Sequence, residues 1–564
     1  MTHTYATDVL VTGAGPVGLT AAVELRRHGV SCRIVDRLPA RLPFAKAVGI
    51  QPRTLEVWDR MGLVRTVLDA AVSMRGQLMY VNGAEQARLE LELPPEVPYG
   101  FAALPQYETE RILDEFLARF GTRVERGTEL VSFTQDAEGV TSRLRTPSGA
   151  EEEVRTRYLV GCDGAHSIVR KGLGLTYEGG AFAEEYMLAD VEVDWDMPPG
   201  YGVRCTHRDG DGTVDDVLVC IPLPGRNRYR MSMLVPPELS ERAGPDAATP
   251  DGITHGLQSG RAPGLPDIQA VLDRLSPRPT TASQIRWASV FRISHRIVNR
   301  YAVDRVFVAG DAAHIHPPTG AQGMNTGIQD AWNLAWKLAL AVDGRARPGL
   351  LASYDAERRP VGEEVVGRTV RHATQGMQTD TDDPATLVLR EAQLLVGYRG
   401  SPLVDPPGEG PGPRPGDRAP DCTGLTHPIA VHPLRLYDLL RDRDQHVLLL
   451  YGAGGGDFRW IDELAQTARD SSGGRMETCV VLAPDAPAAP GIPAVYRDTG
   501  GEFARLYEVD GPTAFVVRPD GYLGARLSPP APGPLAAHLT AVFAASPQRR
   551  EPPEPPAAAA RAAS

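Results

Sequence analysis

Residues 305–339, RVFVAGDAAHIHPPTGAQGMNTGIQDAWNLAWKLA, join an apolar run to a helical pattern through an unusually costly connection. The apolar run ends in Gly310-Asp311, and Pro318, Gly320 and Gly323 precede the helical pattern. A simple strand-to-helix connection takes about two to six residues, whereas this one takes roughly ten and includes glycines that are costly to order. The pattern indicates that irregular backbone is held there for a purpose.

A second candidate site is the loop Gly13-Ala14-Gly15-Pro16-Val17-Gly18, which follows the apolar run at 9–11. Its glycines allow a tight turn, and a helix expected from about Pro16 would point its amino terminus at a pyrophosphate. Asp36 ends the next expected strand, where its carboxylate can accept from a ribose hydroxyl. The loop predicts a bound dinucleotide and is compatible with either NAD or FAD.

A third stretch, residues 158–170 (YLVGCDGAHSIVR), reads as a strand ending in Asp163-Gly164, with Ser167 and Arg170 on the following helical turn. The three motifs, in this order, resemble the fingerprints of the single-component FAD-dependent aromatic hydroxylases, the p-hydroxybenzoate hydroxylase group. The resemblance covers about residues 7–370.

The resemblance implies an enzyme that binds FAD, takes electrons from NADPH or NADH, and uses O2 as co-substrate. Oxygen transfer from a flavin C4a-hydroperoxide would hydroxylate a phenolic or other electron-rich ring, and a small aromatic molecule tailored in polyketide or other natural-product synthesis is the predicted substrate. Two alternatives stay open at this point. One is Baeyer–Villiger-type oxygenation on the same fold, and the other is a flavin-binding scaffold without turnover.

The residues that match the family's motifs give the predicted site. Asp311 is the implied contact of the FAD ribityl chain, and Asp163 and Arg170 belong to the stretch that serves both FAD and the nicotinamide cofactor. The predicted cofactor-binding residues are Gly13, Gly15, Pro16, Val17, Gly18, Asp36, Arg37, Lys46, Gln106, Arg111, Asp163, Gly164, Arg170, Gly310, Asp311, Pro318, Gly320, Gly323, Met324 and Asn325.

Two side chains are candidates for catalysis through substrate hydrogen bonding, His316 and Tyr229. For His316 a simple structural hydrogen bond is the alternative. No metal site is predicted, because His314 and His316, two histidines two residues apart in a loop, are a poor ligand set by themselves. An arginine at 170, on a surface groove near the flavin, could accept the 2′-phosphate of NADPH and favours that cofactor over NADH.

The expected fold is α/β: an FAD-binding Rossmann-like domain with an inserted mixed-sheet substrate domain, followed by a thioredoxin-like C-terminal domain. Alternating strands such as 217–221 and 229–234 suit a lid over an apolar pocket, and strands near 77–82 and 86–92 are expected to join them. The predicted boundaries are 1–178 and 286–398 for the two parts of the FAD domain, 179–285 for the substrate domain, 399–420 for a Pro/Gly linker, 421–546 for the thioredoxin-like domain and 547–564 for a disordered tail.

The thioredoxin resemblance of the C-terminal part lacks the redox motif. Where a working thioredoxin carries CxxC, this chain has GAGGG at 452–456, so thiol exchange is excluded and a structural or oligomer-contact role is predicted.

Composition narrows the partners and the location. A formal charge of −12 and a pI near 5.6 argue against nucleic acid, which needs a dense basic face. The sequence has no apolar run of about 18 residues, so no membrane span is expected. Six cysteines without metal-like spacing favour free thiols in a reducing cytoplasm.

Overall fold

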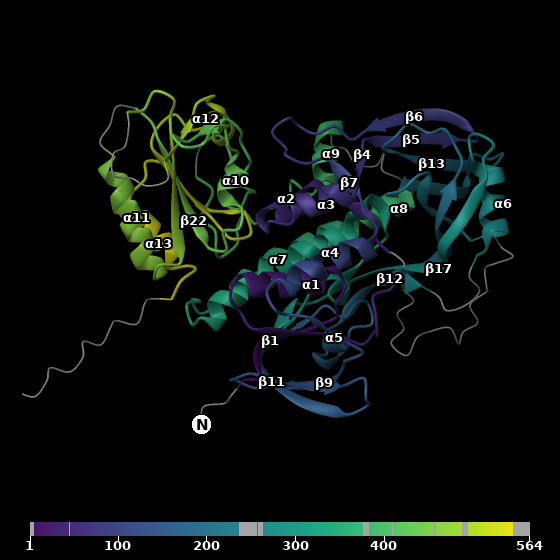
Figure 1. Cartoon of the computed structure of the whole chain (residues 1–564), viewed down its shortest axis with the longest axis horizontal. Helices are drawn as coiled ribbons and strands as arrows, with labels where there is room; N and C mark the ends of the chain where they lie inside the picture. The colour runs from purple at the N-terminus through teal and green to yellow at the C-terminus, as the bar shows by residue number, and fades with distance from the viewer. Residues whose placement is uncertain are drawn as a thin grey trace, which may run out of the picture.

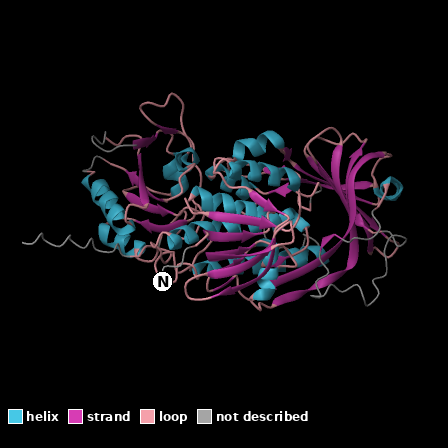
Figure 2. Ribbon diagram, turned by 60° about the horizontal axis from the view of Figure 1, so that its bottom comes forward, coloured by secondary structure: helices cyan, strands magenta, loops and turns pink. Residues whose placement is uncertain are grey.

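The computed structural model describes residues 5–43, 46–235, 256–257, 263–375, 383–408, 410–454, 458–487 and 495–544. An amino-terminal sheet lies at the centre, a large mixed sheet lies on one side of it, and a C-terminal sheet lies on the other (Figures 1 and 2). The long helix α7 (Gln322–Val342) runs between these layers and contacts both α1 (Pro16–Arg27) and α8 (Ser353–Gln375).

The amino-terminal sheet has the order β18-β19-β11-β1-β2-β8, in which β19, β11, β1, β2 and β8 are parallel and β18 pairs antiparallel with β19. Strand β10 pairs antiparallel with β11, and β9 pairs with β10. Val9, Leu10 and Val11 of β1 are fully buried, as expected of a strand covered on both faces. Helices α1, α4 (Gln106–Ala118) and α7 contribute to the same hydrophobic core. The strands are β1 (Thr7–Thr12), β2 (Cys32–Asp36), β8 (Val124–Arg126), β9 (Glu129–Gln135), β10 (Val140–Arg145), β11 (Glu151–Gly161), β18 (Ala302–Val303) and β19 (Val306–Val308).

The large mixed sheet has the order β16-β17-β12-β15-β14-β13-β5-β6, and β20 pairs with β17. Strands β5 and β6 join it from the amino-terminal part of the chain, as the sequence predicts. Its longest ladder pairs Tyr177 with Val298, so the sheet extends past the predicted limits of 179 and 285 at both ends. The strands are β5 (Gly76–Val81), β6 (Ala84–Glu90), β12 (Tyr177–Val193), β13 (Tyr201–Arg208), β14 (Val214–Pro222), β15 (Arg228–Leu234), β16 (Gly256–Leu257), β17 (Ala282–Val298) and β20 (His314–Ile315).

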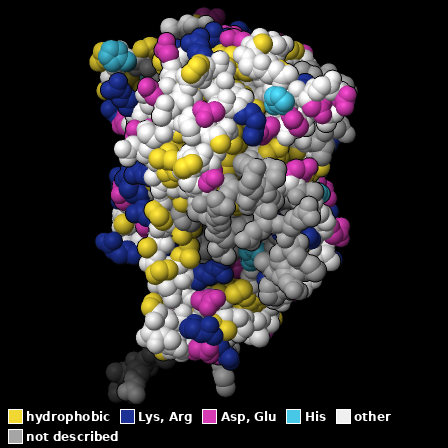
Figure 3. All heavy atoms as spheres, turned by 90° about the vertical axis from the view of Figure 1, so that its right-hand side faces the viewer, with side chains coloured by type: hydrophobic (Ala, Val, Ile, Leu, Met, Phe, Trp, Pro, Cys, Tyr) yellow, Lys and Arg dark blue, Asp and Glu magenta, His cyan; other side chains and the backbone are white. Residues whose placement is uncertain are grey.

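Each face of this sheet has its own surroundings. One face packs on α6 (Leu265–Leu275) through a core that includes Met231, Met233 and Leu272. On the side of the molecule seen in Figure 3, the Lys and Arg side chains of the described residues are interspersed with Asp and Glu side chains.

Short elements connect the layers. A small sheet pairs β7 (Phe101–Ala103) with β3 (Gly49–Ile50) and β4 (Val72–Met74). The helices near it are α2 (Pro52–Arg60), α3 (Val64–Ala70) and α9 (Pro384–Glu391), whereas α5 (Ile168–Gly172) packs against β9, β11 and β19 of the amino-terminal sheet. Among the described helices, none is both long and apolar enough to cross a bilayer.

The C-terminal sheet has the order β21-β24-β23-β22-β25-β26, with β22, β23 and β24 parallel and β25 and β26 antiparallel. Its strands are β21 (Leu425–Thr426), β22 (His446–Gly452), β23 (Met476–Leu482), β24 (Val495–Asp498), β25 (Thr513–Val517) and β26 (Leu523–Leu527), and its helices are α10 (Leu436–Leu440), α11 (Arg459–Ser472), α12 (Glu502–Tyr507) and α13 (Pro532–Leu539). The thioredoxin-like assignment stays a prediction. The end of the glycine run, 455–456, and the predicted tail at 547–564 lie outside the described residues.

The segment predicted as a Pro/Gly linker packs against both of its neighbours. Within its described residues, Leu403 and Ala419 are buried. The Arg418 guanidinium donates to Glu56 of α2 at 2.9 Å and to the Tyr437 hydroxyl at 3.0 Å. Composition alone predicts a linker here, because a high content of proline and glycine gives no sign of the contacts that the few other side chains make.

Candidate flavin and substrate site

The loop between β1 and α1 is shaped by the close approach of another chain segment. Gly13 has φ +90°, and a Cβ there would lie 2.3 Å from the Cys162 carbonyl oxygen at the end of β11. Beside Gly15 the space is open, since a Cβ would meet nothing within 4 Å. Helix α1 begins at Pro16 without a side-chain cap, so its first N–H groups are available to a phosphate.

Asp36 accepts hydrogen bonds from the protein backbone around this loop, in addition to any that it accepts from a ligand. Its Oδ2 accepts the Ala14 amide at 2.7 Å and its Oδ1 accepts the Leu38 amide at 2.8 Å, with an Arg126 nitrogen 3.7 Å from Oδ2. A carboxylate has about four acceptor positions, so a ribose hydroxyl can still be accepted. Arg37, the next residue, is exposed.

The predicted contacts at 46, 106 and 111 play different parts. Gln106 fixes the 46–47 backbone, because its Oε1 accepts the amides of Lys46 and Ala47 at 3.3 and 3.2 Å. The Lys46 side chain is exposed. Arg111 pairs with Glu108 and Glu115 of its own helix at 2.8 Å each, so the structure does not bring its guanidinium to the loops.

The Asp163-Gly164 turn presents a carboxylate oxygen without a protein partner. Asp163 Oδ2 accepts the amides of Ile168 and Val169 at 2.7 and 3.2 Å, whereas no described residue donates to its buried Oδ1. Burial raises the pKa of Asp163, and the hydrogen bonds from Ser167 and from nearby amides oppose that rise. A buried acceptor left unpaired is costly, so this atom is suited to a ligand donor.

The predicted surface position of Arg170 is wrong. Its side chain is 2% exposed, lies 4.0 Å from the centre of the Tyr177 ring, and donates to the Ala312 carbonyl at 3.5 Å. The Tyr177 hydroxyl donates to the Asp311 carbonyl at 2.8 Å. Both side chains therefore hydrogen-bond to the 310–312 backbone. Because the Arg170 side chain is buried, it cannot contact a 2′-phosphate bound in a surface groove.

The Gly310-Asp311 turn lies directly against the first loop. Gly310 has φ +59°, and a Cβ there would lie 2.8 Å from Cγ2 of Val17 on α1. Its amide donates to Asp330 of α7 at 3.1 Å. The Asp311 carboxylate is exposed and has no hydrogen-bond partner among the described residues, as a ligand contact requires.

The turn before α7 is locked by side-chain amides. Asn325 donates to the carbonyls of Gly49 and Ala321 at 3.0 and 2.7 Å, and its Oδ1 accepts the Gln51 amide at 3.0 Å. Its side chain thus holds β3, and only its backbone remains for the predicted cofactor contact. Pro318 and Gly320 are exposed, while Gly323 and Met324 are partly buried in the first turn of α7.

His316 faces the start of this helix. Its Nδ1 hydrogen-bonds the Pro317 carbonyl at 2.9 Å, and a Cβ at Gly323 would lie 3.4 Å from its Nε2. His314 instead bonds Asp330 at 2.8 Å. In the described part of the chain, no group of three or more His, Cys, Asp or Glu side chains could hold a metal ion.

Tyr229 lies on the side of the large sheet that faces away from these loops. Its ring packs edge-on against Trp195, with the ring centres 5.3 Å apart, in the hydrophobic core between the large sheet and α6. The opposite face carries Ile221, which packs against the cluster of Val48 and Leu223, as does Tyr107 beside Gln106. Strand alternation therefore places Tyr229 on the face opposite Ile221, so the structure does not bring its side chain to the flavin loops.

Comparison with known proteins agrees with this geometry. The family model described as an FAD binding domain matches residues 6–369. A flavin-dependent monooxygenase of Mycobacteroides abscessus is 33% identical over 529 residues, which cover 92% of this chain and 96% of that protein. Anhydrotetracycline monooxygenase of Streptomyces rimosus is 31% identical over 530 residues, covering 92% and 94%. Aklavinone-11 hydroxylase, solved with FAD and aklavinone, superimposes with a TM-score of 0.74 at 26% identity over 95% of this chain and 99% of that one.

The chain belongs to the FAD-dependent aromatic monooxygenases. Its predicted α/β fold class, family and FAD cofactor are confirmed. The residues of this monooxygenase fit FAD on three observations, namely the open space beside Gly15, the unpaired Asp163 Oδ1 and the exposed Asp311 carboxylate.

Sequence reasoning missed a buried ion pair on the loop-facing side of the large sheet. Arg230 Nε donates to Asp190 Oδ1 at 2.6 Å, and the side chains are 4% and 1% exposed. The register places Ile221, Arg230, Asp190 and Trp287 side by side across four strands. Arg230 Nη2 has no hydrogen-bond partner in the described structure. An arginine and an aspartate at inward strand positions were the available signal.

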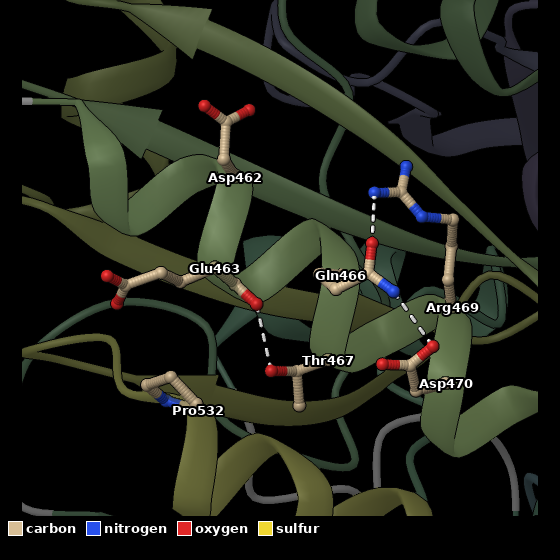
Figure 4. Close-up of a pocket in the computed structure, with 7 residues that line it drawn as sticks. All are labelled: Asp462, Glu463, Gln466, Thr467, Arg469, Asp470 and Pro532. Atoms are coloured by element: carbon tan, nitrogen blue, oxygen red, sulfur yellow. Dashed lines mark hydrogen bonds between the residues drawn. The ribbon is translucent and has the colours of Figure 1, made fainter.

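A surface hollow elsewhere in the monooxygenase carries no comparable chemistry. It measures about 690 Å³ and lies over α11 and the start of α13, with Asp462, Glu463 and Pro532 in its lining (Figure 4). Gln466, Arg469 and Asp470 in the same lining bond to one another along the helix. These are ordinary surface pairs of a helix, and none of the three flavin-loop motifs contributes to the hollow.

Proposed function

We propose that this enzyme hydroxylates a polycyclic, polyketide-derived phenol. The observation that carries the proposal is the row of Ile221, Arg230 and Trp287 on the face of the large sheet that looks toward the flavin loops. It combines apolar and aromatic surface with one cationic donor, which suits a flat ring system bearing an acidic oxygen. Relatives named for anhydrotetracycline and aklavinone support the size and class of this substrate.

The chemistry itself is supplied by FAD, which uses electrons from NAD(P)H to activate O2 for transfer of one oxygen atom to the ring. The protein has three tasks around it. Asp163 and Asp311 would accept hydrogen bonds from the cofactor, the uncapped start of α1 would bind its pyrophosphate, and the first turn of α7 would offer backbone N–H groups to its ring. The large sheet orients the substrate and excludes water.

The choice of nicotinamide cofactor is a separate proposal. The preference for NADPH over NADH was predicted from Arg170. Because the Arg170 side chain is buried, it no longer supports that preference, which stays a prediction. Steady-state oxidation with each cofactor decides the preference, and a kcat/KM for NADH equal to that for NADPH contradicts it.

Three further predictions from the sequence complete the proposal. The enzyme acts in the cytoplasm, the C-terminal domain has a structural or oligomer-contact role, and ring hydroxylation is favoured over Baeyer–Villiger insertion. Size-exclusion chromatography with light scattering tests the oligomer. Mass and NMR analysis of the product tests the reaction, since a lactone or ester counts against hydroxylation.

The central experiment compares NADPH consumption with product formation for a panel of anthracycline-type and tetracycline-type phenols. We expect at least one polycyclic phenol to stimulate oxidation and to gain one oxygen atom, while simple monocyclic phenols stimulate it less. Equal stimulation by simple phenols contradicts the proposed substrate class. No stimulation by any phenol in a folded, FAD-loaded enzyme favours the scaffold alternative.

A further inference from the structure

The C-terminal domain docks on the rest of the enzyme through charged groups that are completely buried. Arg518, in the turn after β25, donates to both Glu357 oxygens on α8 at 2.7 and 2.8 Å, and both side chains are at most 1% exposed. Asp520 in the same turn pairs with Arg518 and accepts from Asn333 and Trp336 of α7, each at 3.1 Å. One turn of the C-terminal domain therefore fixes both long helices.

The same two helices hold the flavin loop. Arg358, the residue after Glu357, donates to Asp330 Oδ1 at 2.7 Å. Asp330 Oδ2 accepts the Gly310 amide at 3.1 Å and the His314 ring at 2.8 Å. Asp330 lies three residues before Asn333 on α7, so the groups that touch the C-terminal domain and those that hold the loop are one helical turn apart.

A second contact links the C-terminal domain, through α2, to the turn that precedes α7. The Asp520 carbonyl accepts from Arg53 of α2 at 3.0 Å. Helix α2 follows Gln51, whose side chain donates to the Gly320 carbonyl at 2.6 Å. Both ends of the turn that precedes α7 are thus tied to elements that the C-terminal domain touches.

Burial makes this arrangement strict. Although burial raises the pKa of Asp330, the charges of Arg358 and His314 bring that pKa below its ordinary value. Buried charges are tolerated only when each is paired, so loss of one partner leaves another uncompensated and the neighbouring groups must move. In the structure Asp330 is held between Arg358 and His314, with its Oδ2 accepting the Gly310 amide.

We propose that Arg518 and Asp520 are positioning residues for the flavin: their docking on α7 and α8 fixes Asp330, which holds the Gly310 amide and the Asp311 turn in the conformation that binds FAD. The inference concerns FAD binding and does not depend on the identity of the substrate.

The test uses the full chain and three single variants. Arg518→Gln breaks the docking pair, Asp330→Asn weakens the hold on the loop directly, and Arg475→Ala is the matched control. Arg475 also crosses between the domains, pairing with Asp343 at 2.6 Å, but both side chains are about 40% exposed. FAD affinity is measured by fluorescence titration of the apoenzyme, and hydrogen exchange of residues 310–316 is measured in the FAD-saturated enzyme.

We expect Arg518→Gln and Asp330→Asn each to raise the Kd for FAD at least tenfold and to speed exchange at 310–316, while Arg475→Ala changes neither by more than twofold. In the double variant the increase in Kd should fall well short of the product of the two single effects, because both act on one path. Multiplicative effects, or an Arg518→Gln enzyme with normal affinity and exchange, overturn the proposal.

Milder variants keep the test decisive if Arg518→Gln does not fold. Trp336→Phe removes one N–H donor to Asp520 and keeps an aromatic ring, and Arg518→Lys keeps the charge without the planar fork. We expect a severalfold rise in the Kd for FAD in both, and unchanged affinity in both overturns the proposal. Since substrate is absent from every measurement, failure of the proposed substrate class would not alter these results.

Discussion

The flavin loops and the large sheet of this enzyme differ in how their proposed ligand sites are built. In the loops, backbone geometry does most of the work, with Gly13 and Gly310 at positive φ and helix starts left uncapped. In the sheet, the proposed substrate surface depends on which side chains share a face, as Tyr229 and Arg230 show by pointing to opposite sides of the same strand. A site formed by backbone geometry (a backbone-built site) is visible in the sequence as a motif of glycines and other turn residues. A site formed by side chains that share one face of a sheet (a face-built site) is visible only as the alternation of inward and outward residues along a strand.

The largest effect is expected from Gly13→Ala. The new Cβ would meet the Cys162 carbonyl in a backbone conformation that alanine rarely adopts, so we expect no FAD-loaded enzyme and a destabilised apoenzyme. Gly15→Ala is the matched control, because its methyl group meets no protein atom. It should leave the thermal stability of the apoenzyme unchanged and still weaken FAD, as measured by differential scanning fluorimetry and flavin titration. Equal behaviour of the two variants would contradict the backbone-built site.

Asp311→Ala should weaken FAD without unfolding the loop. Its exposed carboxylate has no partner among the described residues, so the loss is confined to the ligand. A hydrogen bond involving a charged group contributes about 1.5–3 kcal/mol, or about 10- to 150-fold in the Kd for FAD. Flavin fluorescence titration and far-UV circular dichroism check the two halves of this expectation, and an unchanged Kd would remove Asp311 from the site.

Arg230→Lys tests the face-built site. The lysine keeps the charge near Asp190 but loses the second nitrogen donor, so we expect about a tenfold rise in substrate KM, equivalent to about 1.4 kcal/mol, with the flavin spectrum unchanged. Tyr229→Phe on the opposite face should leave KM within about twofold. A rise in KM for Tyr229→Phe, with none for Arg230→Lys, would reverse the assignment of the faces.

The smallest effect is expected for His28, which lies outside both sites. Its buried surroundings change its pKa and so make the free energy of unfolding depend on pH. Burial, with Arg27 and Arg475 nearby, lowers the pKa of His28 to about 3, although Glu24 lies 4.0 Å away. Below pH 6.5 the unfolded chain binds a proton that the folded chain refuses, so stability falls as the pH decreases toward 3. From pH 6 to pH 5 this costs about 1 kcal/mol, and His28→Gln should lack that part of the loss in urea unfolding. Parallel pH profiles for the two proteins would show that His28 titrates normally.

The success of sequence reasoning follows the same division. The loops at 13–18, 163–164 and 310–323 were located because glycine, proline and aspartate at fixed spacing have few structural explanations. The motif at 158–170 predicts the position of Arg170 on a helical turn, but it does not predict what covers that turn, and the side chain is buried. Arg111 and Asn325 were matched to the family's pattern, yet their side chains are committed to bonds within the protein.

By itself the sequence determined the fold class, the family and the cofactor, because these depend on local backbone requirements that a few residue types satisfy. Only the tertiary structure decided which face of the large sheet meets the flavin loops, that Arg230 and Asp190 are buried as a pair, and that Arg518 reaches Glu357 across 161 positions of chain. The physical reason is that burial and pairing of side chains arise from segments distant in sequence, and no local pattern encodes which of them come together.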